Sequence, residues 1–344
     1  MIKRIKKNFI NKTPVLITGA VGFIGFHLSK LLLNEGYSII GFDNLNDYYS
    51  VSLKQSRLDV LREYSDFTFV KGDLADGKAV ESIFNYYEPR IIVHMAAQAG
   101  VRYSIENPRT YIESNITGFL NILEACRHGS IEHLIYASSS SVYGNRKETP
   151  FKVGDDVITP ISLYAATKIS NEVMAHTYSH LFEIPATGLR FFTVYGPYGR
   201  PDMAYFKFAD MIFRGEPIQV YNHGDLYRDF TYIDDITKAI LRMLHRPPKA
   251  GATAGTQARY KVYNIGGGQP EHLLHFIETL ENALGVTAKK EFLPMQPGDV
   301  YKTYADTTEL EMDFSVIPKV RIEEGLVHFA GWYKEYYKLH LHML

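Results

Sequence analysis

A glycine-rich turn between a short strand and a helix is the feature that most constrains the fold. Residues 15–18 (VLIT) are an apolar run rich in β-branched side chains, residues 19–25 hold three glycines, and residues 26–33 have an apolar helical pattern. Such a turn lets the backbone approach a pyrophosphate closely, and the N–H groups at the helix N-terminus bind the anion. The residues that we expect to contact a dinucleotide here are Gly19, Gly22, Phe23, Ile24 and Gly25.

An aspartate at the end of the next strand-like run supports this interpretation. Residues 38–42 (SIIGF) lead to Asp43, where a carboxylate about 20 residues beyond the turn accepts hydrogen bonds from the adenosine ribose. Asp43 favours NAD over NADP, because a 2′-phosphate would meet a negative charge and no arginine immediately follows. The alternative is a loop aspartate that binds no ligand.

Strand-like runs alternate with helical patterns through the first half of the chain. The runs cover residues 15–18, 38–43, 67–71, 91–95 and 133–138, and a further one covers residues 186–191. This order predicts an α/β fold, in which a doubly wound parallel sheet has helices on both faces. Beyond residue 193 the pattern becomes mixed and rich in aromatic residues, which indicates a smaller mixed α/β part that binds substrate.

Tyr164 and Lys168 form a second candidate site. They stand four residues apart on a predicted helix, so the phenol and the ammonium share one face and can converge on one substrate hydroxyl. A tyrosine is a poor base at its usual pKa of about 10, but Lys⁺ and a nicotinamide cation both favour the phenolate. The spacing alone is a common accident in helices. Its position after the glycine turn and the serine run 138–141 favours a catalytic pair.

Composition and charge exclude several classes of function. The net charge of −1 gives no electrostatic reason to expect nucleic acid or an anionic membrane as a partner. One cysteine, Cys126, cannot form an internal disulfide, and its helical pattern predicts a buried structural thiol, so we expect a cytoplasmic protein. Residues 1–7 are a basic tail rather than a signal peptide, and no apolar run of about 20 residues predicts a membrane span. We expect no metal site.

Several further motifs carry a resemblance to a known family. They are residues 72–74 (GDL), 94–98 (HMAAQ), 138–144 (SSSSVYG), 228–235 (RDFTYIDD) and 296–299 (QPGD). Together with the glycine turn and the Tyr164/Lys168 pair, they resemble the NAD-dependent sugar-nucleotide epimerases of the extended short-chain dehydrogenase/reductases, over nearly the whole chain. Residues 97–104 (AQAGVRYS) and 191–205 look most like the members that act on UDP-glucuronate.

This resemblance implies a resident NAD and oxidation of the sugar at C4. Tyr164 is then the general base and acid, Lys168 holds the nicotinamide ribose, and Ser139 hydrogen-bonds the reacting oxygen. A 4-keto sugar forms, rotates and takes the hydride back on its other face, which gives the C4 epimer. The further cofactor contacts that the resemblance implies are Asp73, at the adenine, Leu74 and Ala96.

An epimerase that acts on UDP-glucuronate must prevent the loss of its C6 carboxylate as carbon dioxide. A ketone at C4 lies β to the C6 carboxylate, and such acids lose carbon dioxide when the breaking bond aligns with the carbonyl. By resemblance Arg200 and Thr193 fix the carboxylate, since a guanidinium and a hydroxyl suit its geometry. Ser140 and Ser141 are expected to assist, where related 4,6-dehydratases have an Asp-Glu pair and decarboxylases a glutamate. The alternative for Arg200 is a surface arginine in a proline-flanked loop.

For the nucleotide, the resemblance implies that Arg228 and Asp299 hold the diphosphate and the uridine ribose, and that Arg102 reaches the cofactor or a substrate phosphate. The alternatives are a surface ion pair and a turn aspartate. Two other functions stay open for the chain. One is an epimerase for UDP-glucose or a UDP-N-acetylhexosamine, in which Arg200 is idle. The other is a non-catalytic NAD-binding regulator, which the presence of Ser139, Tyr164 and Lys168 together disfavours.

The resemblance also implies a domain organisation. Residues 1–190 form a Rossmann-type NAD-binding domain with returns near residues 231–245 and 262–266, and residues 191–344 mainly bind the UDP-sugar. Helices near residues 110–127 and 163–182 are expected to pair across the two-fold axis of a homodimer, although their apolar residues could equally pack on the sheet. Residues 251–258 are small and polar, which predicts an exposed insertion without fixed structure.

Overall fold

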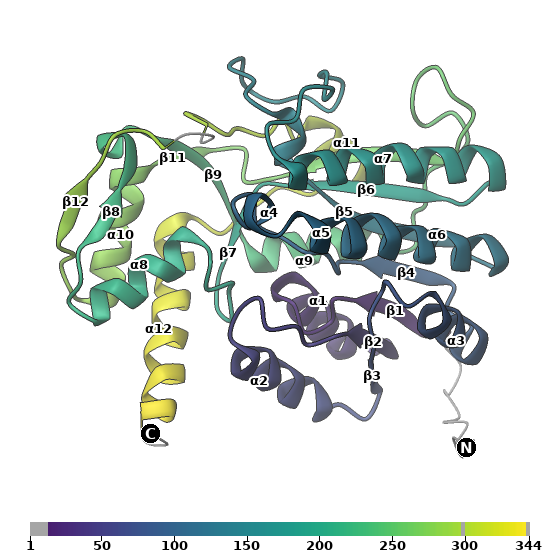
Figure 1. The fold of residues 1–344 in the computed structure, drawn as a ribbon, viewed down its shortest axis with the longest axis horizontal. Coiled ribbons are helices and arrows are strands. Elements are labelled where there is room, and N and C mark those ends of the chain that lie inside the picture. The colour runs from purple at the N-terminus through teal and green to yellow at the C-terminus, as the bar shows by residue number, and fades with distance from the viewer. Residues whose placement is uncertain (1–12, 297–299, 342–344) are drawn as a thin grey trace.

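A seven-stranded parallel sheet forms the centre of the molecule in the computed structural model, which describes residues 13–296 and 300–341 (Figure 1). The basic tail at residues 1–7 and Asp299 lie outside the described residues. From β1 the chain adds strands toward one edge and then crosses back to add the others on the opposite side, so the doubly wound α/β prediction is confirmed. In spatial order the strands are β10 (Tyr260–Ile265), β6 (Ala186–Phe191), β5 (His133–Ser139), β4 (Ile91–His94), β1 (Val15–Thr18), β2 (Ile39–Asp43) and β3 (Phe67–Lys71).

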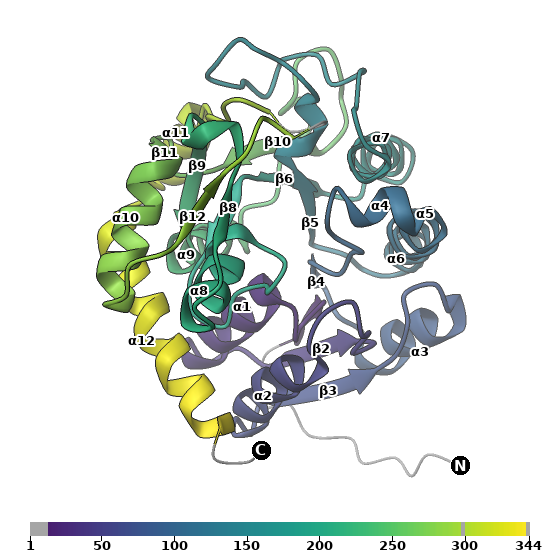
Figure 2. The ribbon, with the colours of Figure 1, turned by 60° about the vertical axis from the view of Figure 1, so that its left-hand side comes forward.

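Helices cover both faces of this sheet, which explains why the residues of its central strands are almost all buried and mostly apolar. Successive side chains of a strand point to opposite faces, so Ile17 packs in one buried cluster and Leu16 in another. Figure 2 shows the two helical layers on either side of the sheet. One layer contains α1 (Phe23–Asn34), α2 (Val51–Arg62) and α9 (Ile233–Met243), and the other contains α3 (Gly77–Tyr87), α6 (Gly118–His128) and α7 (Leu163–Phe182).

A smaller region lies to one side of the sheet, at the left in Figure 1. Its strands form a three-stranded sheet, in the order β11-β9-β7, and a two-stranded sheet of β12 and β8. These strands are β7 (Thr193–Tyr195), β8 (Ile218–Val220), β9 (Tyr227–Tyr232), β11 (Pro270–His272) and β12 (Lys290–Phe292), and the helices of this region are α8 (Ala204–Phe213), α10 (Leu273–Leu284), α12 (Ile322–Leu341) and the short η3 (Tyr221–Gly224). Helix α11 (Thr308–Phe314) packs against β10 and α9 at the large sheet. Short helices elsewhere are α4 (Tyr103–Glu106), α5 (Pro108–Tyr111), η1 (Ile112–Thr117) and η2 (Ser140–Tyr143).

The chain returns to the large sheet after it has entered the smaller region. Helix α9 packs against α1, and β10 pairs in parallel with β6, with Tyr260 opposite Ala186 and Ile265 opposite Phe191. The two regions are therefore interleaved in sequence. The division at residue 190 stays a prediction.

Two local features differ from what the sequence suggests. The helical stretch near residues 110–127 contains a π-helical segment, η1, between α5 and α6. Residues 251–258 are largely exposed, as predicted, but hydrogen bonds fix two of their side chains. The Thr253 hydroxyl donates to the Tyr260 carbonyl (2.6 Å), and Thr256 Oγ1 lies 3.2 Å from His176 Nε2.

Three findings concern the cysteine, membrane-spanning helices and metal sites. Cys126 is a buried free thiol, as predicted, and burial raises its pKa. Within residues 13–296 and 300–341, no helix is long and apolar enough to cross a bilayer. In the same ranges, no three His, Cys, Asp or Glu side chains gather as a metal ion would require.

Candidate active site

One cavity of about 810 Å³ lies between the large sheet and the smaller region. It runs from the glycine turn, past the ends of β2, β4 and β5, to Arg228 on β9. Of the candidate site residues, all that fall within the described ranges line it: Gly19, Gly22, Phe23, Ile24, Gly25, Asp43, Asp73, Leu74, Ala96, Arg102, Ser139, Ser140, Ser141, Tyr164, Lys168, Thr193, Arg200 and Arg228. The fold thus brings together residues that are more than two hundred positions apart in the sequence, while the role of each stays a proposal.

The glycine turn has the shape that a dinucleotide requires. Gly19 has a φ of +67°, and a Cβ there would lie 2.7 Å from the Ala96 nitrogen; a Cβ on Gly25 would lie 2.0 Å from the Gly19 carbonyl oxygen. Gly22 stands at the N-cap of α1 and has no side chain to bond the first N–H groups of the helix. These N–H groups can therefore bind an anion such as a pyrophosphate, so the residues present fit NAD.

The adenosine end of the cavity is also built by backbone contacts. The Asp43 carboxylate accepts hydrogen bonds from Leu45 N (2.8 Å) and Val21 N (3.3 Å), so the turn itself sets its position. Burial raises the pKa of Asp43, and hydrogen bonding and nearby positive charges oppose this rise. The Asn44 amide donates to the Asp73 carboxylate (2.9 Å), which links the two acidic residues expected at the ribose and the adenine.

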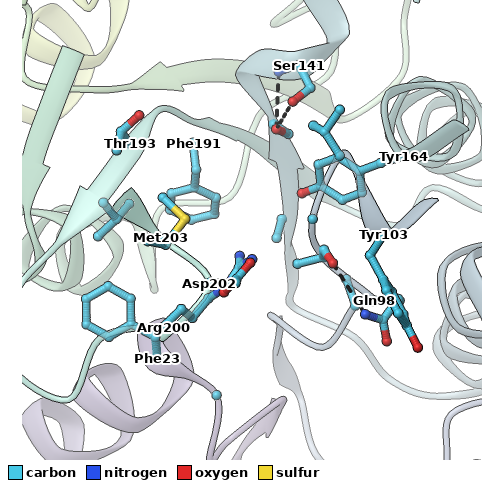
Figure 3. Close-up of a pocket in the computed structure, with 18 of the residues that line it drawn as sticks. Phe23, Gln98, Tyr103, Ser141, Tyr164, Phe191, Thr193, Arg200, Asp202 and Met203 are labelled. Carbon is cyan, nitrogen blue, oxygen red and sulfur yellow. Dashed lines mark hydrogen bonds and ion pairs between the residues drawn. The ribbon is translucent and has the colours of Figure 1, made fainter. Parts of the chain in front are cut away.

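At the opposite end, α7 and β5 hold the expected catalytic groups. Ser162 Oγ accepts a hydrogen bond from Ala165 N (3.1 Å), so this N-cap starts α7 immediately before Tyr164. Ser139 is the last residue of β5, and its Oγ lies 3.2 Å from both the backbone nitrogen and the hydroxyl of Ser141. Figure 3 shows Tyr164 and Ser141 on one side of the cavity, with Thr193 and Arg200 facing them.

The electrostatics of the tyrosine differ from the expectation that Lys168 lowers its pKa. Burial raises the pKa of Tyr164, and the positive charge of Arg200, followed by a hydrogen bond with Ser139, opposes this rise. Lys168 donates instead to the Ala137 carbonyl (2.8 Å), and its nitrogen lies 5.9 Å from the centre of the Tyr164 ring. Burial lowers the pKa of Lys168 to about 8, and the charge of Glu172 opposes that effect.

Arg200 has an acidic partner that the sequence did not reveal. Its Nε lies 3.0 Å from Asp202 Oδ1 and its Nη2 lies 2.5 Å from Asp202 Oδ2 (Figure 3). The Tyr48 hydroxyl donates to the same Oδ2 (3.1 Å). Burial opposes ionisation of Asp202, but the Arg200 charge holds its pKa below the usual value. Arg200 is therefore a fixed cation near Tyr164.

A buried ion pair behind the serine run was also not predicted. Arg190 on β6 donates two hydrogen bonds to Glu172 on α7 (2.9 and 2.8 Å), and the Ser138 hydroxyl donates to the same carboxylate (2.5 Å). Arg190 also donates to the Tyr143 hydroxyl (2.9 Å), which fixes the far end of η2. The signal that could have revealed this pair is an arginine inside an otherwise apolar strand.

Three comparisons place the chain among known proteins. The sequence model described as "NAD dependent epimerase/dehydratase family" matches residues 15–266. "Protein CapI" of Staphylococcus aureus is 53% identical over 332 residues, which cover 94% of this chain and 99% of that protein. A "Probable UDP-glucuronate 4-epimerase" of Rhizobium meliloti (strain 1021) is 47% identical over 332 residues, which cover 94% of this chain and 97% of that protein. The crystal structure of UDP-glucuronic acid 4-epimerase from Bacillus cereus with UDP-glucuronic acid and NAD aligns with a TM-score of 0.84 at 33% identity, covering 94% of this chain and all of that one.

Proposed function

The chain belongs to the NAD dependent epimerase/dehydratase family, and on that premise we propose that it converts UDP-glucuronate into UDP-galacturonate by epimerisation at C4. The relatives from Rhizobium meliloti and Bacillus cereus, whose names carry this activity, support the proposal. The observation that carries it is the position of Arg200. Figure 3 shows Arg200 and Tyr164 facing each other across the cavity that both line, and the Arg200 charge opposes the rise in the pKa of Tyr164, so a cation lies near the group expected to react with the sugar.

The cofactor end of the cavity fits NAD, with the glycine turn and the N-terminus of α1 at the pyrophosphate and Asp43 at the adenosine ribose. When bound, NAD⁺ accepts a hydride from C4 of the sugar and later returns it. Asp73, Leu74 and Ala96 line the same end of the cavity and are proposed to contact the cofactor.

The residues at the sugar end divide the proton chemistry between them. Tyr164 accepts the proton of the C4 hydroxyl as the ketone forms and donates it again when the alcohol is restored. Ser139, hydrogen-bonded to the phenol, also orients the C4 oxygen. Lys168 keeps a positive charge under the Tyr164 ring and holds the nicotinamide ribose. One tyrosine serves both directions, because the ketone can present either face after it rotates.

The sugar carboxylate must stay out of line with the C4 ketone. Arg200 is held at Asp202 through Nε and Nη2, so its Nη1 can meet the substrate carboxylate. Thr193, at the start of β7, faces the same space, and Ser141 approaches it from just beyond the end of β5 (Figure 3). Ser140 lines the same cavity and is proposed to assist. A carboxylate bound at several points cannot rotate into the geometry for loss of carbon dioxide. Arg228, which lines the cavity, and Asp299, which lies outside the described residues, are proposed to hold the diphosphate and the uridine ribose. Arg102 is proposed to reach the cofactor or a substrate phosphate.

We further propose that the protein is a homodimer and that it is cytoplasmic. The division into a cofactor domain (residues 1–190) and a mainly substrate-binding part (residues 191–344) is also proposed. Helices α6 and α7 lie side by side on the outer face of the sheet (Figure 2). They expose large apolar side chains, namely Leu120 (39% exposed), Val173 (61%) and Leu181 (61%). Apolar side chains on two adjacent helices suit an interface with the same helices of a second copy.

The test is to incubate the purified protein, without added cofactor, with UDP-glucuronate, UDP-glucose and UDP-N-acetylglucosamine, and to separate the products by chromatography. UDP-galacturonate should form, and NAD should be released when the protein is denatured. Turnover of the neutral sugars alone would establish the alternative epimerase. No turnover of any sugar, even with NAD added, would contradict the proposal.

A further inference from the structure

Two residues from the cofactor side of the cavity hold the arginine that is proposed to bind the sugar carboxylate. We propose that Arg57 and Tyr48 are positioning residues for Arg200, so that selectivity for a charged sugar depends on the segment that follows the adenosine-binding aspartate. This inference rests on the proposed function. Neither residue belongs to the glycine turn, the serine run or the Tyr164/Lys168 pair.

Arg57 lies on α2 and is completely buried. One of its terminal nitrogens, Nη1, donates to the Val21 carbonyl in the glycine turn (2.8 Å) and to the Tyr49 hydroxyl (2.7 Å). The other, Nη2, donates to the carbonyls of Tyr198 (2.7 Å) and Gly199 (3.0 Å). Arg57 thus joins the cofactor turn to the two peptide groups immediately before Arg200.

The hydrogen bonds of Arg57 indicate that its role is to fix two backbone segments relative to each other. All four acceptors are neutral, and Arg57 Nε is buried without a hydrogen-bond partner among the described residues. A buried cation without a bonded carboxylate is costly, and an apolar side chain would avoid that cost. What the guanidinium provides is a rigid fork that fixes two separate backbone segments at once. Tyr198 needs such fixing, because its φ of +52° is unfavourable for a residue with a Cβ.

Tyr48 acts on the side-chain partner of Arg200 rather than on its backbone. Its hydroxyl donates to Asp202 Oδ2 (3.1 Å), the same oxygen that Arg200 Nη2 contacts. The Tyr48 ring packs against Tyr103, with centroids 4.8 Å apart, and lies over Gly100, where a Cβ would come within 2.4 Å of the hydroxyl. The phenol is therefore placed by its surroundings, and it orients the carboxylate that orients Arg200.

The loop before Arg200 rests on the cofactor side elsewhere as well. His27 Nε2 lies 2.9 Å from the Pro197 carbonyl, and the Tyr198 ring lies 5.0 Å from that of Phe26. Both partners are on α1, whose N-terminus carries the glycine turn. The placement of the carboxylate-binding arginine is thus set from α1, α2 and the loop between β2 and α2.

The experiment compares Arg57→Lys and Tyr48→Phe with two matched controls, Arg62→Lys on the exposed side of the same helix and Tyr64→Phe just beyond its end. Arg62 makes an exposed ion pair with Asp59, and the Tyr64 hydroxyl bonds Asn34, so the controls lose similar groups away from the cavity. Affinities for UDP-glucuronate and for neutral UDP-glucose are measured by calorimetry on NAD-loaded protein, together with kcat on UDP-glucuronate and the melting temperature.

Arg57→Lys should lower the preference for UDP-glucuronate over UDP-glucose by about 10-fold or more, since a single ammonium cannot bond the glycine turn and the loop before Arg200 at once. Tyr48→Phe should lower it by about 3-fold to 10-fold, and each control should stay within about 2-fold. An equal loss of affinity for both sugars, or an unchanged preference, would show that the two residues are merely structural. If Arg57→Lys does not fold, Tyr48→Phe alone decides. Failure of the unaltered protein to epimerise UDP-glucuronate would instead overturn the proposed function.

Discussion

The two ends of the cavity are built from different materials. At the proposed cofactor end, backbone groups form the site: the Gly19–Gly25 turn, the N-terminus of α1 and the N–H groups that hold Asp43. At the sugar end, charged side chains form it, through Arg200, Asp202 and the buried Lys168. Adding a side chain at the cofactor end should therefore abolish NAD binding, and removing a charge at the sugar end should selectively weaken binding of the charged sugar.

The largest effect is expected from Gly25→Val. A Cβ at this position would lie 2.0 Å from the Gly19 carbonyl oxygen and 2.8 Å from its carbon, so the turn must open. NAD content should fall to the background of the assay, and turnover of every UDP-sugar should disappear with it. Gly331→Ala on α12 is the control, because nothing lies within 4 Å of its Cβ, and alanine in a helix should stabilise by about 0.5–1 kcal/mol. Retention of NAD by Gly25→Val would show that backbone shape does not define this end.

Tyr164→Phe should abolish chemistry while both ligands still bind. The ring keeps its packing but loses the hydroxyl that exchanges the C4 proton, so kcat should fall by about 10²-fold or more. NAD content and the dissociation constant for UDP-glucuronate, measured by calorimetry, should stay close to those of the unaltered protein. A kcat within a few-fold of the original would assign proton transfer to another group.

Arg200→Met should discriminate between charged and neutral sugars. Loss of a charge-assisted contact, worth about 1.5–3 kcal/mol, predicts that affinity for UDP-glucuronate falls by roughly 10-fold to 100-fold, while UDP-glucose loses far less. The freed carboxylate can align with the C4 ketone, so residual turnover should release carbon dioxide and a UDP-pentose. Equal losses on both sugars would place Arg200 at the diphosphate or in the scaffold.

The smallest expected effect concerns the pH dependence of stability. Burial lowers the pKa of Lys168 from 10.5 to about 8 in the folded protein. Between these values the unfolded chain binds more protons than the folded one, so this residue makes stability rise as pH increases from about 8 to 10.5. NAD-free protein should therefore gain a few degrees in melting temperature over this window relative to Lys168→Met. Lys78→Met, at an exposed position on α3, is the control, and its melting temperature should change with pH as that of the unaltered protein does. If the melting temperature of Lys168→Met also follows that of the unaltered protein, Lys168 is not a buried cation.

The same contrast explains what could be predicted from the sequence. Gly19, Gly25 and Asp43 lie within one strand–helix–strand unit, so spacing and turn chemistry were enough to place them at one end of the cavity. Arg200 was expected from a resemblance, but its pairing with Asp202 was not, although only two residues separate them. Spacing does not reveal which neighbour an arginine will bind.

Contacts between distant segments left no signal in the sequence at all. Tyr48 meets Asp202 across 154 positions, and Arg57 meets Gly199 across 142. The polar composition of residues 251–258 correctly predicted their exposure, but it gave no sign of the hydrogen bond between Thr256 and His176 on α7. Side-chain networks depend on the assembled fold, whereas the cofactor turn is specified locally.

In the proposed reaction, hydride leaves C4 of UDP-glucuronate and returns to the same carbon while Tyr164 exchanges the proton of the oxygen. The most direct test supplies UDP-glucuronate labelled with deuterium at C4 to the purified protein and examines the product by nuclear magnetic resonance and mass spectrometry. We expect UDP-galacturonate that retains deuterium at C4 when the reaction runs in ordinary water, with no carbon dioxide released. Loss of the label to solvent, or an inverted product that acquires a solvent hydrogen at carbon, would contradict the proposed reaction.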